Sequence, residues 1–154
     1  MFEFLKSFET SKNRIEMGCT VVWRVSRNDI EQLRASLPYP IPSQLLALYE
    51  EVGIGVFCRG SSGQKSISHN TIIPPNEVLS VLDGTSELVL PYTQLQPDTL
   101  PFFDRDLDSF LCLHPKSENP NAVHWMWGEK ICDSLVEFIQ RLVEDPDWFN
   151  PPKL

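Results

Sequence analysis

Three aspartates at alternate positions come closest in this chain to the pattern of a cation site. Asp104, Asp106 and Asp108 could place three carboxylates around a hard divalent ion. An EF-hand loop also needs Gly at its sixth position and Glu at its twelfth, where this chain has Ser109 and Pro115. We therefore expect no metal site here. An acidic turn that leads into a strand and a protein-binding patch remain the two interpretations of the segment.

Nucleophilic catalysis would need a cysteine beside a histidine that lowers its pKa. The candidates are Cys19, Cys58, Cys112, Cys132, His69, His114 and His124. The cysteines form no Cys-x-x-Cys pair and no zinc-type spacing, and nothing in the sequence places a histidine beside Cys58 or Cys112. Gly60-Ser61-Ser62-Gly63 lacks the spacing of a G-x-S-x-G elbow, and no phosphate-binding glycine loop occurs. We expect no catalytic residue and no cofactor.

The negative charge of the chain is unevenly distributed. The net charge is −8, and residues 98–147 contain eleven acids against four bases. Because an acidic surface repels phosphate backbones, we expect no nucleic-acid partner. A solvated surface that keeps the chain soluble is the simplest explanation, and binding of a basic protein is the alternative.

Two further features concern location. No basic segment precedes an apolar one at the N-terminus, and no apolar run approaches the roughly 18 residues of a membrane span. The sequence therefore predicts a cytoplasmic protein with reduced thiols and no membrane contact.

Hydrophobic spacing and capping residues predict five helices. They cover residues 2–16, 26–37, 43–52, 75–82 and 134–144. Ser26 with Asp29 and Ser134 with Glu137 are typical N-capping pairs. Gly53 suits the left-handed conformation that ends many helices.

Runs of β-branched and apolar residues predict strands at 20–25, 56–58, 71–73 and 88–90, with 93–101 irregular. The best hairpin pairs residues 109–114 with 122–127 across a loop of turn-forming residues. Alternation places Val123, Trp125 and Trp127 on one face of its second strand. We expect both tryptophans to pack in the core or against a helix. An exposed one would become a candidate hot spot at an interface.

The order of these elements indicates the fold class. Helices come first, strands with short connections follow, and a helix ends the series. This order predicts an α+β fold, with a mostly antiparallel sheet and helices packed on one side. The length of 154 residues predicts one domain, 1–154.

Several sequence blocks follow one another in a fixed order between residues 41 and 143. They are Ile41-Pro42 with Leu45-x-x-Leu48-Tyr49-x-x-Val52-Gly53, Ile73-Pro74 with Val78-Leu79, Leu100-Pro101-Phe102-Phe103-Asp104 with Asp108 and Leu111-Cys112-Leu113, Val123-x-Trp125, and Ser134-Leu135-x-Glu137-Phe138. In this order and spacing the blocks resemble the SUKH superfamily, the Smi/Knr-like domain. The resemblance implies an α+β fold and a non-catalytic role.

The resemblance also implies the class of partner. Many bacterial members are immunity proteins that neutralise a polymorphic toxin, often a nuclease, whereas fungal members are scaffolds in cell-wall and stress signalling. A nuclease grips phosphates through a basic cleft, so an acidic protein can be steered to it and occlude it. We therefore expect an immunity protein that binds a cognate, basic toxin through an acidic surface. A scaffold or regulatory protein-interaction module is the alternative.

The acidic surface supplies the candidate contact residues and leaves the oligomeric state open. The candidates are Asp104, Asp106, Asp108, Trp125, Glu129 and Asp133.

Overall fold

The computed structural model describes residues 1–10, 20–58, 70–86, 95–105 and 109–150. The predicted strand at 88–90 and two of the candidate residues, Asp106 and Asp108, lie outside these ranges. The helices are η1 (Glu3–Phe8, a 3₁₀ helix), α1 (Arg27–Ser36), α2 (Ser43–Glu51), α3 (Pro75–Asp83) and α4 (Leu135–Glu144). The strands are β1 (Val21–Trp23), β2 (Ile54–Val56), β3 (Thr71–Ile72), β4 (Leu100–Arg105), β5 (Ser109–Leu113), β6 (Val123–Trp125) and β7 (Lys130–Cys132).

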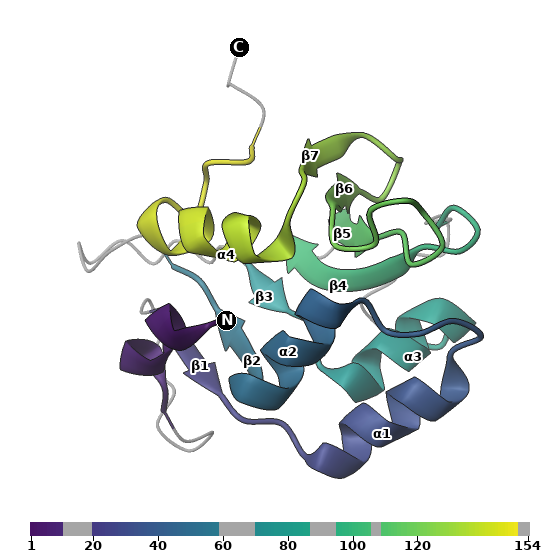
Figure 1. Cartoon of the computed structure of the whole chain (residues 1–154), viewed down its shortest axis with the longest axis horizontal. Helices are drawn as coiled ribbons and strands as arrows, with labels where there is room; N and C mark the ends of the chain where they lie inside the picture. The colour runs from purple at the N-terminus through teal and green to yellow at the C-terminus, as the bar shows by residue number, and fades with distance from the viewer. Residues whose placement is uncertain (11–19, 59–69, 87–94, 106–108, 151–154) are drawn as a thin grey trace.

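All seven described strands form one antiparallel sheet in the order β1-β2-β3-β4-β5-β6-β7. Each strand pairs with the next one along the chain, although α1 and α2 lie between β1 and β2 and α3 lies between β3 and β4. In Figure 1 the sheet runs from β1 to β7, with α2 in front of it, α1 and α3 below and α4 above. The predicted α+β fold is confirmed.

Local signals fix most helix ends. The Ser26 hydroxyl accepts a hydrogen bond from the Asp29 amide, and the Ser134 hydroxyl accepts one from the Glu137 amide. After α2, Gly53 has φ +116°, and a Cβ there would lie 2.1 Å from the Trp23 carbonyl oxygen. A glycine is therefore required where the chain turns back beside β1.

The predicted helix over residues 2–16 is wrong in its described part, because the helix ends at Phe8 and Glu9 forms a parallel bridge with Val22 of β1. Residues 11–16 of the prediction lie outside the described ranges. Phe2 and Leu5 are both buried. Their spacing of three residues fits a 3₁₀ helix as well as an α-helix, so the pattern could not separate the two.

Two strands were not predicted. β4 begins at Leu100 and contains Pro101, a residue type that usually argues against a strand. A bulge between Pro101 and Phe103 accommodates the proline in the sheet. Asp104 consequently lies within β4, paired with Phe110, and not in an acidic turn. β7 has only three residues, too few to show a period.

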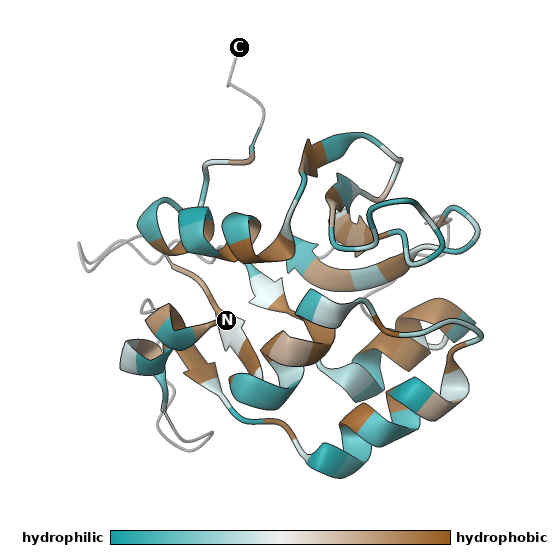
Figure 2. Cartoon of the chain, in the orientation of Figure 1, coloured by the Kyte–Doolittle hydropathy of each residue, from teal (hydrophilic) through white to brown (hydrophobic). Residues whose placement is uncertain are grey.

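Aromatic side chains fill the space between α4 and the sheet. The Phe138 ring of α4 lies 5.5 Å from that of Phe103 and 6.1 Å from that of Phe102, edge to face in both cases. Phe149, which follows α4, lies 5.2 Å from Phe138 and 5.7 Å from Trp125 of β6. Figure 2 shows the matching hydropathy, with α4 hydrophobic toward the sheet and hydrophilic away from it. We call Phe102, Phe103, Trp125, Phe138 and Phe149 the aromatic cluster.

Gln44 joins the N-terminal ends of α2 and α4. Its side-chain oxygen accepts hydrogen bonds from the Ser134 hydroxyl at 3.1 Å and from the Val136 amide at 3.0 Å. The Gln44 amide in turn donates to the Asn121 side-chain oxygen at 3.0 Å. The first backbone amides of a helix have no partner within the helix, and here residues far away in the sequence accept their hydrogen bonds.

Two histidines stack at the junction of β5 and β6. The rings of His114 and His124 are 4.0 Å apart and nearly parallel, at 5°. Among the described residues, His114 Nε2 and His124 Nδ1 have no hydrogen-bond partner and are shielded from solvent. Burial lowers the pKa of both imidazoles, and for His124 the neighbouring His114 and Lys130 lower it further.

Replacing Gln44 with alanine should destabilise the fold by about 1–2 kcal/mol, because the Val136 amide and the Ser134 hydroxyl lose their acceptor. Urea unfolding measures this loss. Gln32→Ala, at an exposed position of α1, is the control and should change the unfolding free energy by less than about 0.5 kcal/mol. Equal effects at the two positions would show that the Gln44 contacts add nothing.

Acidification should weaken the fold through the histidine pair. The folded chain favours neutral imidazoles, so their folded pKa values lie below the unfolded value near 6.5. The contribution is complete above about pH 6.5 and is lost as the pH falls below it. The free energy of unfolding should therefore decrease as the pH is lowered from about 7.5 to about 5.5. The decrease should be smaller in the double variant His114→Phe/His124→Phe. An identical slope in the variant would contradict this origin.

Candidate functional site

The structure separates the predicted contact residues into buried and exposed ones. Asp104 in β4 is only 5% exposed and Trp125 in β6 is 6% exposed, so neither presents its side chain freely. Glu129 directly precedes β7 and Asp133 directly follows it, and both residues are exposed. Trp125, Glu129 and Asp133 are brought together on the hairpin formed by β6 and β7, which we call the β6–β7 hairpin (residues 123–133).

The turn of this hairpin is held by several hydrogen bonds. The Trp125 amide donates to the Glu129 carbonyl at 2.8 Å, and the Gly128 amide donates to the Trp125 carbonyl at 2.9 Å. Gly128 has φ +107°, which favours glycine. The Gln96 side-chain amide donates to the Trp127 carbonyl at 3.0 Å and thereby ties the turn to the segment before β4.

Trp127 is the residue of this hairpin that sequence analysis misplaced. We expected it to pack in the core or against a helix, yet its side chain is 54% exposed. β6 ends at Trp125, so the alternation does not continue to Trp127, which instead stacks on the Trp125 ring at 4.8 Å and 7°. The Trp127-Gly128 pair was the available signal, since glycine after a short strand indicates a turn.

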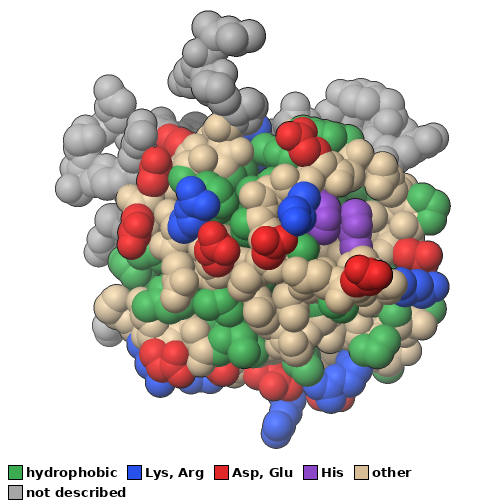
Figure 3. Space-filling model, turned by 45° about the horizontal axis from the view of Figure 1, so that its top comes forward, with side chains coloured by type: hydrophobic (Ala, Val, Ile, Leu, Met, Phe, Trp, Pro, Cys, Tyr) green, Lys and Arg blue, Asp and Glu red, His purple; other side chains and the backbone are tan. Residues whose placement is uncertain are grey.

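The C-terminal part of the chain carries exposed carboxylates on the hairpin, in the β5–β6 loop and on α4, and some of them form ion pairs. The ion pairs are Asp98–Lys116 at 3.2 Å, Lys130–Asp133 at 2.7 Å and Glu137–Arg141 at 3.7 Å. Glu118, Glu129 and Glu144 form no ion pair with any residue that the structure describes. Figure 3 shows acidic side chains interspersed with basic and hydrophobic ones on the face that it presents.

The structure brings one cysteine next to a histidine, which the sequence could not reveal. Cys112 of β5 and His124 of β6 are directly opposite each other across the two strands. Burial raises the pKa of the fully buried Cys112 thiol to about 12. The thiol therefore stays protonated and inaccessible, and this pair lacks the thiolate that nucleophilic catalysis requires.

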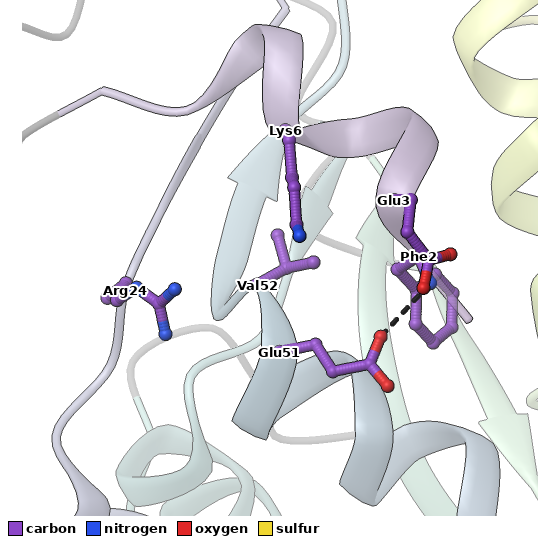
Figure 4. Close-up of a pocket in the computed structure, with 6 residues that line it drawn as sticks. All are labelled: Phe2, Glu3, Lys6, Arg24, Glu51 and Val52. Carbon is purple, nitrogen blue, oxygen red and sulfur yellow. Dashed lines mark hydrogen bonds between the residues drawn. The ribbon is translucent and has the colours of Figure 1, made fainter.

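A separate hollow of about 240 Å³ lies beside η1 and the end of α2. Figure 4 shows Lys6, Arg24 and Glu51 around it. Glu51 accepts hydrogen bonds from the Phe2 amide at 3.0 Å and contacts the terminal ammonium group at 3.2 Å, while Arg24 contacts Glu9 at 3.4 Å. These charges hold the N-terminal segment against α2.

Metal sites and membrane spans are both absent from the described residues. Among these residues, no group of three or more His, Cys, Asp or Glu side chains is arranged to hold a metal ion. Within the same ranges, no helix has the length and apolarity to cross a membrane.

Comparison with known proteins places the chain in a family. A model of the SMI1/KNR4 family (SUKH-1) matches residues 24–141, from just after β1 into α4. The chain is also 25% identical over 130 residues to a Bacillus subtilis (strain 168) protein named "Immunity protein YxxD", an alignment that covers 81% of this chain and 84% of that protein. The family match includes α1 to α3, strands β2 to β7 with the β6–β7 hairpin, and most of α4, and the chain therefore belongs to the SMI1/KNR4 family (SUKH-1).

Proposed function

We propose that this chain is an immunity protein, which binds a cognate polymorphic toxin and neutralises it in the cytoplasm. The observation that carries the proposal is membership of the SUKH-1 family together with the similarity to a protein named as an immunity protein. The chain would act by binding alone, without catalysing a reaction.

The charge distribution supports a basic toxin as the partner. Exposed carboxylates lie on the β6–β7 hairpin, on α4 and in the β5–β6 loop, and three of them have no ion pair within the described ranges. An acidic surface attracts a basic partner and accelerates its association, most strongly at low salt. A basic nuclease would meet these conditions, because its substrate-binding cleft must attract phosphates.

The most direct test is rescue of a toxin-producing cell. The neighbouring genes would be searched for a secreted protein with a C-terminal toxin domain, and a candidate domain found there would be expressed with and without the chain. We expect growth to be restored and the two purified proteins to form a complex of fixed stoichiometry. A chain that neither rescues growth nor binds the toxin domain would refute the immunity role. Several weak partners in its place would favour the scaffold alternative.

Charge reversal should slow toxin binding. Glu129→Lys/Asp133→Lys should lower the association rate constant by roughly tenfold at low salt, and by much less at high salt, because steering is screened. Stopped-flow fluorescence measures the rate. Glu31→Lys/Glu50→Lys makes the same charge change at exposed positions of α1 and α2 and serves as the control. If both variants slowed association equally, net charge and not the proposed surface would be responsible.

A further inference from the structure

Trp127 is an unusually costly residue to leave in water. Among the described residues the large hydrophobic side chains that are exposed are Met1, Leu82 and Trp127, and Trp127 is the most exposed of the three at 54%. One face of its indole is covered by Trp125. Tryptophan at the centre of a protein interface often supplies much of the binding energy.

The surroundings hold Trp127 in place before any partner arrives. Hydrogen bonds fix both sides of its turn, through Gly128 on the hairpin and through Gln96 from another segment. Trp125, on which it stacks, is in turn packed against Phe149 of the aromatic cluster. A side chain that is already ordered loses little conformational entropy on binding, which favours affinity.

The charges around Trp127 indicate which side chain of a partner it would accept. Glu129 lies two residues further along the same turn, is exposed, and has no ion pair with any described residue. The Arg105 guanidinium already lies 5.4 Å from the centre of the Trp125 ring, so the tryptophan stack contacts a cation within this chain. An exposed indole and an exposed carboxylate on one turn suit an arginine or lysine, because the stem of such a side chain is apolar and its end is charged.

We propose that Trp127 and Glu129 form an anchor for an arginine or lysine side chain of the bound toxin. The cation lies against the exposed part of the Trp127 indole, and its charge is balanced by the Glu129 carboxylate. This inference rests on the proposed immunity function and assigns it a contact point. The hollow at Phe2 offers no comparable anchor, because Glu51 there is engaged by the N-terminal segment.

Isothermal titration calorimetry with the purified toxin domain identified in the rescue experiment tests the anchor. Trp127→Ala should weaken binding by at least about thirtyfold, the range of an interface hot spot. Trp127→Tyr, which keeps a ring with a π face, should weaken it by only about three- to tenfold. Glu129→Gln should weaken binding by about five- to tenfold, more so at low salt.

Matched variants separate the anchor from general effects. Leu82→Ala removes an exposed apolar side chain on α3, and Glu31→Gln removes an exposed carboxylate on α1, outside the proposed surface; both should bind as the wild type does. Thermal melting checks that all variants are folded. The anchor would be overturned if Trp127→Ala bound the toxin domain as tightly as the wild type, or if Leu82→Ala lost as much affinity as Trp127→Ala. Either result would leave the immunity role intact. A wild-type chain that does not bind the toxin domain would refute the immunity role and the anchor with it.

Discussion

The packing of Phe138 against Phe102, Phe103 and Phe149 is the interaction on which the C-terminal half of this chain depends. It joins α4 to β4 and holds the segment after α4 against the same rings. Because Phe149 also contacts Trp125, the cluster extends into β6 and supports the ring on which Trp127 stacks. A buried packing interaction thereby determines where an exposed side chain stands.

Polar contacts complete this arrangement where apolar packing cannot. Gln44 at the start of α2 satisfies groups at the start of α4, and Asn121 from the β5–β6 loop satisfies the start of α2. The helices and the loop are therefore fixed relative to one another by directional bonds as well as by the core. Such a frame suits a protein whose function is binding, because little of the surface must be ordered when the partner arrives.

Structural features that depend on neighbouring residues could be predicted from the sequence, whereas features that depend on distant contacts could not. Ser26 and Ser134 revealed their helices because a cap and its amide are three residues apart, and the family blocks indicated the fold class. β4 was missed because the bulge that tolerates Pro101 depends on pairing with β5. The exposure of Trp127 depends on where β6 ends, and the contact of Gln44 with Ser134 spans ninety positions. Glu129 and Asp133 were placed on an exposed hairpin, whereas Asp104 lies inside the sheet.

We propose that the β6–β7 hairpin, supported by the aromatic cluster, is the surface that binds the toxin. Hydrogen–deuterium exchange would compare the chain alone with the chain saturated by the toxin domain that it neutralises. We expect slower exchange in residues 123–133 and around Gln96, with α1 and α3 unchanged. Protection confined to α1 and α3, with the hairpin exchanging as in the unbound chain, would contradict it.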